Sequence, residues 1–224
     1  MKRIIKETSD GSKTLYVNDL DETYHSHHGA VQEAEHVFIK NGSKLIISDE
    51  INILELGFGT GLNALVTINE FLKNENIKKV NYFTLEKYPV NDAEITELNY
   101  AQHFSDENFK NINEKIHHSV WEELVEIVPN FYLKKIQQDF FNLEKIDLPP
   151  IDLVYFDCFG ARVQPDLWEE NLIKMVTDKI ETGGLFTTYS SKGSVRRILS
   201  SLNMNVEKKP GPPGKREMMI AWKI

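Results

Sequence analysis

The middle of the chain alternates between short apolar runs and longer segments with helical periodicity. The apolar runs cover residues 52–56, 80–86, 131–137, 151–156 and 184–189, and helical patterns occupy residues 61–73, 91–103, 112–128, 165–180 and 194–201. Continuous apolar strands separated by helices are typical of a parallel sheet that is covered on both faces. The pattern therefore predicts an α/β fold.

Both ends of the chain depart from this alternation. The segment "RIIKETSDGSKTLYV" has a turn-forming sequence between two strand-like arms, which predicts a hairpin, and a helix follows near residues 31–40. At the other end, "MNVEKK" and "REMMIAWKI" flank a Pro/Gly-rich turn, which predicts a closing hairpin with one antiparallel strand. We therefore expect a mostly parallel sheet of seven strands in a single domain, residues 1–224, with residues 1–45 as an N-terminal extension.

Composition indicates the size of the core and the cellular compartment of this domain. The 224 residues are 41% hydrophobic, which is enough for one sizeable core. The single cysteine, Cys158, excludes a disulfide within the chain, and no apolar run approaches the length of about 18 residues that a membrane span needs. We expect a cytoplasmic protein without a membrane partner.

Charge is distributed unevenly along the sequence. The chain carries a formal net charge of -8, yet residues 183–224 contain eight lysines and arginines against two glutamates. A basic surface of this kind attracts polyanions, although it can equally be a solvated face. Charge alone leaves both interpretations open.

A glycine-rich loop carries the most informative chemistry in the sequence. In "NILELGFGTGLNAL", an apolar strand is followed by Gly57, Gly59 and Gly61 and then by a helix. Glycines allow the loop to turn tightly and to bring backbone amides close to a ligand, and the helix N-terminus favours negative charge. The dinucleotide fingerprint would require glycine at position 62, which is Leu62, so a pyrophosphate is disfavoured. An ordinary glycine-rich turn is the alternative.

Acidic residues follow the next strands of the predicted sheet. Glu86 ends "YFTLE" and Asp139 follows "KKIQQ". The carboxyl ends of parallel strands meet at one edge of a sheet, where open α/β folds bind their ligands. Glu86 can accept hydrogen bonds from ribose hydroxyls or pair with Lys87 as a solvated carboxylate, and Asp139 can equally be a plain surface residue.

Asp157 is placed in the same way, at the end of the apolar run "VYFD". Helix capping is the other role for such an aspartate, but the next helix is better started at Pro165, a residue type favoured in the first turn. Asp157 should therefore join the other strand-end residues in a functional site.

The glycine pattern after an acidic strand end resembles motif I of the class I S-adenosylmethionine-dependent methyltransferases. That resemblance implies a Rossmann-like fold, S-adenosyl-L-methionine as cofactor, and an adenine site at Asp139 and Phe140. The implied cofactor-binding residues are Gly57, Phe58, Gly59, Thr60, Gly61, Asn63, Glu86, Lys87, Asp139, Phe140 and Asp157.

Longer stretches resemble a narrower family. "DETYHSHHGAVQEAEHVFIKNG", "EKYP", "DCFGARVQPDLW" and "SSKGSVRRILSSLNMNVEKKPGPPGKREMMIAWK" are similar to the methyltransferase module of the bacterial enzymes that complete 5-methylaminomethyl-2-thiouridine at the tRNA wobble base. The resemblance covers about residues 21–223. Bifunctional members add a flavin-dependent oxidoreductase, and this chain resembles the stand-alone type. It implies methylation of the primary amine of 5-aminomethyl-2-thiouridine in tRNA, after a separate enzyme has made that amine.

The same resemblance implies roles for individual residues. Asp157 would be the catalytic residue that holds the amine, either as the base that accepts its proton or as a group that only positions it. The implied substrate-binding residues are Tyr24, Ser26, Glu33 and Phe159 around the acceptor, and Lys192, Arg196, Arg197, Lys215 and Arg216 on the tRNA backbone. Relatives often have glycine at the position of Cys158 and Ala-Pro in place of Gly160-Ala161, which leaves the shape of this loop open.

Three histidines, His25, His27 and His28, raise the question of a metal. No cysteine accompanies them and no acidic residue lies at a recognised ligand spacing, so we expect no metal. A solvated loop or a phosphate contact is the alternative.

Two other functions compete with methyl transfer to tRNA. A polyamine (spermidine-type) synthase has a related fold and a similar cofactor, and "YH" followed by "GAVQE" is faintly similar to it. A catalytically silent tRNA-binding module is the other, although such a protein has little need for the glycine loop, Glu86 and Asp157 together.

Overall fold

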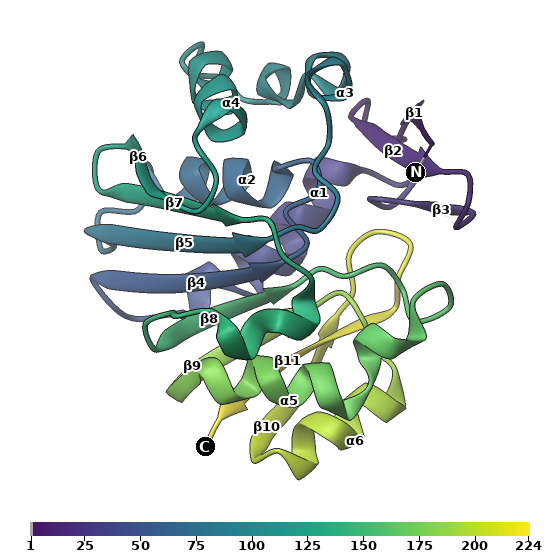
Figure 1. The fold of residues 1–224 in the computed structure, drawn as a ribbon, viewed down its shortest axis with the longest axis vertical. Helices are drawn as coiled ribbons and strands as arrows, with labels where there is room; N and C mark the ends of the chain where they lie inside the picture. Colours follow the sequence, from purple (N-terminus) through teal and green to yellow (C-terminus); the bar gives the residue numbers. More distant parts are fainter. Residues whose placement is uncertain (1) are drawn as a thin grey trace.

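An eight-stranded mixed sheet forms the centre of the computed structural model, which describes residues 2–224 (Figure 1). The strands follow the order β10-β11-β9-β8-β4-β5-β7-β6. Their bounds are β4 Glu50–Leu56, β5 Lys79–Leu85, β6 Leu124–Val128, β7 Phe131–Ile136, β8 Ile151–Phe156, β9 Ile180–Thr188, β10 Met204–Pro210 and β11 Glu217–Lys223. The inner strands pair in parallel, and β6 and β11 pair antiparallel with their neighbours. The predicted α/β fold with a C-terminal hairpin is confirmed.

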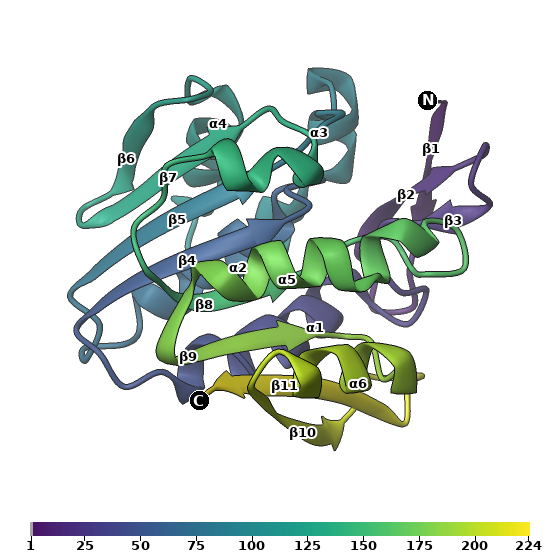
Figure 2. The ribbon, with the colours of Figure 1, turned by 60° about the horizontal axis from the view of Figure 1, so that its bottom comes forward.

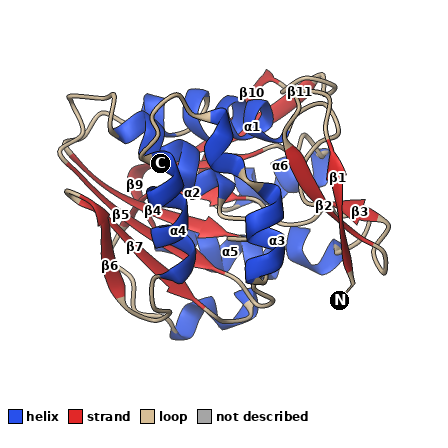
Figure 3. Cartoon of the chain, turned by 90° about the horizontal axis from the view of Figure 1, so that it is seen from above, coloured by secondary structure: helices blue, strands red, loops and turns tan. Residues whose placement is uncertain are grey.

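Helical segments cover both faces of this sheet (Figures 2 and 3). One layer contains α1 Ala30–Ala34, the π-helix η1 Glu35–Lys40, α2 Leu62–Phe71, α3 Asp92–Leu98, η3 Tyr100–His103 and α4 Phe109–His118. The other contains η4 Phe140–Lys145, η5 Pro165–Trp168, α5 Glu170–Lys179 and α6 Gly193–Ser201; the short turn η2 Ser43–Leu45 precedes β4. No helix within residues 2–224 is long and apolar enough to cross a bilayer.

Alternation along the strands explains the two layers. In β4, Ile51 and Ile53 belong to the apolar cluster on the α2 side, while Leu54 and Leu56 belong to the cluster on the α5 side. Burial on both faces is what makes the inner parallel strands read as continuous apolar runs. The carboxyl ends of these strands point toward the N-terminal segment of the chain (Figure 1).

The prediction of one helix over residues 112–128 is wrong in its second half. Helix α4 ends at His118, and residues 124–128 form β6, an edge strand antiparallel to β7. Glu122 and Asn130 have φ values of 67° and 66°, which interrupt helical geometry on both sides of the strand. Helical and strand periodicity cannot be separated in so short an apolar segment, and pairing with β7 decides it. This strand is the eighth, in addition to the seven expected.

The N-terminal segment begins with a separate three-stranded antiparallel sheet of β1 Arg3–Glu7, β2 Lys13–Val17 and β3 Glu22–Thr23. The predicted hairpin is therefore confirmed, with β3 as an additional short strand. The helical residues that follow pack on the central sheet, where the Thr187 hydroxyl donates a hydrogen bond to the Val37 carbonyl over 3.2 Å. The small sheet lies beside the carboxyl ends of the central strands (Figure 1).

Candidate active site

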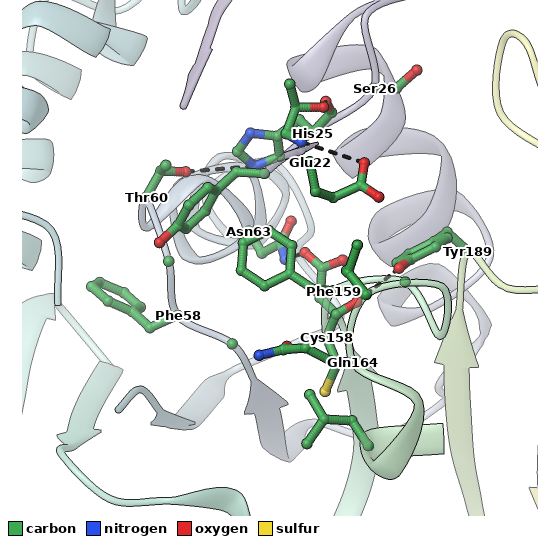
Figure 4. A pocket seen from close by; sticks show the side chains of 18 of the residues that line it. Glu22, His25, Ser26, Phe58, Thr60, Asn63, Cys158, Phe159, Gln164 and Tyr189 are labelled. Carbon is green, nitrogen blue, oxygen red and sulfur yellow. Dashed lines mark hydrogen bonds between the residues drawn. The ribbon is translucent and has the colours of Figure 1, made fainter. Parts of the chain in front are cut away.

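A cavity of about 760 Å³ lies where the strand ends of the central sheet meet the N-terminal segment (Figure 4). Fifteen of the residues predicted for the site line it, namely Tyr24, Ser26, Glu33, Gly57, Phe58, Gly59, Thr60, Asn63, Glu86, Lys87, Asp139, Phe140, Asp157, Phe159 and Lys215. Gly61, Lys192, Arg196, Arg197 and Arg216 are not part of its lining. The structure therefore brings most of the predicted residues into one place and leaves four of the five basic residues outside the lining of the cavity.

The glycine loop has a geometry that only glycine adopts without strain. Gly57, Gly59 and Gly61 have φ values of 99°, 50° and 73°. A Cβ atom on Gly57 would lie 2.8 Å from the Asp157 carbonyl oxygen, and one on Gly59 would lie 3.0 Å from the Tyr24 ring. These glycines let the loop pass close to both neighbours and leave its backbone facing the cavity.

Glu86 is anchored by the backbone around it. Its side chain accepts hydrogen bonds from the Gly59 amide over 3.0 Å and from the Tyr88 amide over 2.7 Å, and the residue is only 9% exposed. Glu86 thus ties the end of β5 to the glycine loop, and a carboxylate has lone pairs left for further donors. Lys87 does not pair with Glu86, because its ammonium group lies 2.7 Å from an Asp139 carboxylate oxygen.

Asp139 has a local structural role as well as a place in the cavity lining. Its other carboxylate oxygen accepts a hydrogen bond from the Phe141 amide over 3.0 Å, which caps η4. The hydrogen bond from Lys87 lowers the pKa of Asp139 below its ordinary value, so this carboxylate is ionised at neutral pH.

Asp157 faces the cavity from the loop after β8. Its carboxylate accepts a hydrogen bond from the Asn63 side-chain amide over 2.8 Å. Burial raises the pKa of Asp157 to about 7, against the opposing effects of that hydrogen bond and of the Lys215 charge, while the Glu33 charge raises it further. A carboxyl group with this pKa exchanges a proton readily near neutral pH. The next helical turn, η5, begins at Pro165 with Gln164 as its N-cap, so Asp157 does not cap it.

Tyr24 and Phe159 form an aromatic wall of the cavity. Their rings meet edge to face with centroids 5.0 Å apart and an interplanar angle of 81°. Burial raises the pKa of Tyr24 to about 12, so its phenol stays neutral. Such a wall offers a planar ligand an apolar surface with fixed geometry.

Glu33 and Lys215 bring the two ends of the chain together. A Glu33 carboxylate oxygen lies 2.8 Å from the Lys215 ammonium group, and the other oxygen accepts a hydrogen bond from the Ser26 amide over 2.8 Å. The Lys215 ammonium group also lies 4.0 Å from the centroid of the Tyr189 ring. Lys215, predicted to contact tRNA phosphates, is thus held inside the site in this structure.

The sequence did not predict Tyr189 as a site residue, and it gave no role for Cys158. The Tyr189 hydroxyl donates a hydrogen bond to the Cys158 carbonyl over 2.7 Å, which links the loops after β8 and β9 (Figure 4). Cys158 is 3% exposed, and burial raises the pKa of its thiol, so it packs in the core as a neutral group. An aromatic residue directly after a buried strand was the signal that could have identified Tyr189.

Glu55 is a second residue that was missed. Its carboxyl group is fully buried and accepts a hydrogen bond from the Thr84 hydroxyl over 2.7 Å. Burial raises the pKa of Glu55 to about 8. Burial also raises the pKa of Tyr82, and the nearby Glu55 carboxylate raises it further. Within residues 2–224, its second oxygen has no hydrogen-bond partner. A glutamate inside an apolar strand was the available signal.

The three histidines occupy different surroundings. His25 is half-buried in the cavity lining with its ring nitrogens 3.3 Å from the Thr14 hydroxyl and 3.5 Å from the Thr60 hydroxyl, and desolvation lowers its pKa to about 4. His28 packs against Gly214, where a Cβ atom would lie 2.0 Å from the imidazole ring. Across residues 2–224, no three His, Cys, Asp or Glu side chains gather as metal ligands would.

The remaining basic residues lie next to the main cavity. A second cavity of about 600 Å³ is lined by Tyr189, Ser190, Ser191, Lys215, Arg216 and Glu217. Lys192, Arg196 and Arg197 follow in sequence at the start of α6. The predicted basic set is therefore divided between the lining of this cavity and the adjoining helix.

Comparisons with known proteins agree with this geometry. The chain is 30% identical over 217 residues to the tRNA 5-methylaminomethyl-2-thiouridine biosynthesis bifunctional protein MnmC of Leptospira borgpetersenii, and 27% identical over 215 residues to that of Marinomonas sp.. These matches cover 89% and 91% of this chain but only 32% and 31% of the relatives, so the chain spans about a third of their length.

Two solved structures show the same fold. The crystal structure of MNMC2 from Aquifex aeolicus has a TM-score of 0.79 at 24% identity, covering 99% of this chain and 70% of that one. A spermidine synthase in complex with a transition-state analogue has a TM-score of 0.52 at 15% identity, covering 99% and 73%. The family model described as S-adenosyl-L-methionine-dependent methyltransferase matches residues 105–224. With more than half of its length matched by this model, the chain belongs to that family of S-adenosyl-L-methionine-dependent methyltransferases.

Proposed function

We propose that the protein transfers a methyl group from S-adenosyl-L-methionine to the primary amine of 5-aminomethyl-2-thiouridine at the wobble position of tRNA. The observation that carries the proposal is Asp157, a carboxyl group with a pKa of about 7 in the cavity that the glycine loop borders. The names of the curated relatives support the acceptor, because a methylamino group is what methylation of an aminomethyl group produces.

The cavity residues fit the cofactor by their chemistry. The glycines of the loop present bare backbone to a methionine moiety, and any Cβ at Gly59 would displace the Tyr24 ring. We assign the ribose hydroxyls to Glu86, which is already aligned by two backbone amides, and the adenine to Asp139 and Phe140. Phe58, Thr60 and Asn63 complete the lining on the loop side.

Asp157 would handle the proton of the acceptor amine. When bound, S-adenosyl-L-methionine supplies a methyl group on a cationic sulfur, and the electrons of the C–S bond return to sulfur as the new N–C bond forms. The amine has to be neutral to attack, and it gains a positive charge when the bond forms. The Asp157 carboxylate accepts the proton that the nitrogen releases, and its pKa is close to the pH at which such transfer is most effective.

Substrate position would depend on the aromatic wall. Phe159 follows Asp157 by two residues, so a base packed against the Phe159 and Tyr24 rings holds its 5-substituent near the carboxylate. Alignment of the amine with the methyl group contributes to the rate by removing translational freedom. Ser26 and Glu33 lie on the same side of the cavity.

The partners follow from this chemistry. We assign the formation of the amine to a separate enzyme, and we take tRNA as the macromolecular substrate and the cytoplasm as the place of the reaction. The basic residues Lys192, Arg196, Arg197 and Arg216 are assigned to the RNA backbone. Their contribution should decline as salt rises, because phosphate contacts release counterions.

Nucleoside analysis tests the proposal directly. Purified protein is incubated with S-adenosyl-L-methionine and tRNA from cells that lack this methylation, and the digested nucleosides are analysed by mass spectrometry. We expect one methyl group on 5-aminomethyl-2-thiouridine, and no gain on any nucleoside would refute the proposal. Calorimetric titration with S-adenosyl-L-methionine separates a silent tRNA-binding module, and transfer of an aminopropyl group from the decarboxylated cofactor would support the polyamine alternative.

A further inference from the structure

Lys215 and Tyr189 are shared by the two cavities of the site. Both residues line the main cavity of about 760 Å³ and also the second cavity of about 600 Å³. The loop that carries Lys215 joins β10 to β11 and runs below the N-terminal sheet, where His28 packs on its Gly214 (Figure 1). A flexible side chain at this junction can reach either cavity.

The second cavity has the chemistry of an anion site. Lys215 and Arg216 contribute two cationic groups, and Ser190 and Ser191 contribute hydroxyl donors. The one acid in the lining, Glu217, is paired with Lys208 at 2.8 Å, which lowers its pKa and places a positive charge beside its carboxylate. Helix α6 begins directly after this lining, at Gly193, with its positive dipole end.

The main cavity has to bind a cation. The proposed acceptor amine is an ammonium group in water at neutral pH, so it enters the cavity as a cation. Glu33 is a buried carboxylate able to receive it, but Glu33 is paired with Lys215. A cation from the substrate and the Lys215 ammonium group therefore compete for one carboxylate.

We propose that the second cavity binds a backbone phosphate of the RNA beside the target nucleotide, and that Lys215 moves from Glu33 to this phosphate, which leaves Glu33 to hold the substrate ammonium group. The inference rests on the proposed function, since it takes the acceptor to be an amine-bearing nucleotide in RNA. The Tyr189 ring, 4.0 Å below the ammonium group, borders both positions and stabilises a cation between them.

This exchange makes amine binding stronger when a phosphate is bound. A free nucleoside has no phosphate to attract Lys215, so it has to compete with the existing ion pair, whereas RNA removes the competitor as it binds. Binding energy from a remote part of the substrate is thereby used at the reacting end. Glu33 holds the cation until it loses one proton to water, and Asp157 remains available to accept the second proton, which the nitrogen releases after the N–C bond forms.

The variant Lys215→Met separates the two effects because it keeps an unbranched side chain of nearly the same length and removes the charge. An unmodified anticodon stem-loop RNA is titrated by fluorescence anisotropy at several KCl concentrations. In a plot of log affinity against log salt, we expect the negative slope to become shallower by about 0.7 to 0.9. This is the change that the loss of one phosphate contact produces. Lys215→Arg should keep the slope of the unsubstituted protein. An unchanged slope in Lys215→Met overturns the phosphate site.

The nucleoside gives the opposite expectation. In the presence of S-adenosyl-L-homocysteine, calorimetry measures the affinity for free 5-aminomethyl-2-thiouridine. Lys215→Met should bind it roughly two- to fivefold more tightly, since an ion pair of this kind no longer competes. Glu33→Gln should bind it more weakly. Equal or weaker binding by Lys215→Met overturns the exchange. If the ion pair had only a structural role, its loss would weaken the binding of both the RNA and the nucleoside.

Lys79→Met is the matched control. Lys79 also pairs with a glutamate at 2.8 Å, Glu50, but at the amino-terminal ends of β4 and β5, the edge of the sheet opposite the cavity. It should change neither the salt slope nor the nucleoside affinity. Both measurements are of binding, so they judge the exchange even if nucleoside analysis finds no methylation and the proposed function fails.

Discussion

The glycine loop and the Glu33–Lys215 pair border the same cavity but are held in place in different ways. On the cofactor side, backbone hydrogen bonds continue past the strands. The Asp157 amide donates to the Leu56 carbonyl over 3.1 Å, the Gly57 amide to Leu85 over 3.0 Å, and the Glu86 amide to Ile136 over 3.0 Å. Three neighbouring loops are therefore fixed by the sheet itself.

The acceptor side is assembled from side chains that are distant in sequence. Glu33 and Lys215 are joined by one ion pair, and Tyr24 meets Phe159 through ring contact alone. Side-chain contacts of this kind are weaker and more adaptable than a continued backbone ladder. The difference indicates a rigid half around the glycine loop and a more adjustable half on the side that we assign to the acceptor.

The largest expected effect comes from Asp157, where the two halves meet. Asp157→Asn keeps the size of the side chain but cannot accept a proton. We expect methylation of tRNA to fall by about 100-fold or more, the usual contribution of a positioned base. Single-turnover kinetics measure the rate, and calorimetry should show an affinity for S-adenosyl-L-methionine that is little changed. A rate close to that of the unsubstituted protein would remove Asp157 from the chemistry.

Gly59→Ala tests the rigidity of the cofactor side. Its φ of 50° and the Tyr24 ring, 3.0 Å from an added Cβ, both oppose a side chain. We expect the affinity for S-adenosyl-L-methionine to fall by roughly tenfold, for a conformational cost of about 1–2 kcal/mol. Gly11→Ala is the control, because Gly11 has a φ of 80° and open space around it. Equal affinities in the two variants would show that the loop adapts.

Asn63→Ala tests whether the hydrogen bond from Asn63 sets the pKa of Asp157. The Asn63 hydrogen bond stabilises the ionised form of Asp157 and opposes the effect of burial, so its loss should raise the Asp157 pKa above about 7. The base is then protonated at neutral pH and regains its function at higher pH. We expect the ratio of variant to unsubstituted kcat/KM to rise between pH 6.5 and pH 9. Ionisation of the amine affects both proteins and cancels from the ratio, and a flat ratio contradicts the prediction.

Glu55→Gln should have the smallest effect, and it concerns stability beneath the site. The pKa of Glu55 is about 8 in the folded protein against an ordinary value of 4.5, so the folded state holds a proton that the unfolded state releases. Stability is complete below about pH 4.5 and declines as pH rises to about 8. Glutamine does not titrate, so the variant should gain stability relative to the unsubstituted protein at pH 8.5.

Thermal unfolding at pH 5 and pH 8.5 measures this gain. A difference of about 1 kcal/mol corresponds to roughly 2–4 °C in a protein of this size. The exposed Glu75→Gln is the control and should show the same Tm difference from the unsubstituted protein at both pH values. A Glu55→Gln variant that gains nothing at high pH would mean that the carboxyl group is ionised in its buried position.

Sequence periodicity predicted the strands that are buried on both faces, because such strands are apolar throughout. It failed at β6, an edge strand whose alternation is short and whose identity depends on pairing with β7. The strand-end residues Glu86, Asp139 and Asp157 could be placed in one site because parallel strands bring their carboxyl ends together. The contact between Glu33 and Lys215 joins residues 182 positions apart, and no local pattern encodes it.

What the sequence determined by itself is the cofactor half: an apolar strand, glycines where a side chain would collide, and acids at adjacent strand ends. Tertiary structure decided the acceptor half, where Lys215 pairs with a buried glutamate and Tyr189 joins two loops. It also decided the raised pKa of Glu55, because that pKa depends on how deeply the fold buries the carboxyl group. The physical reason is the range of the interactions. Residues close together in sequence determine the backbone geometry and the order of the strands. Charge pairing and burial depend instead on which distant side chains the fold brings together.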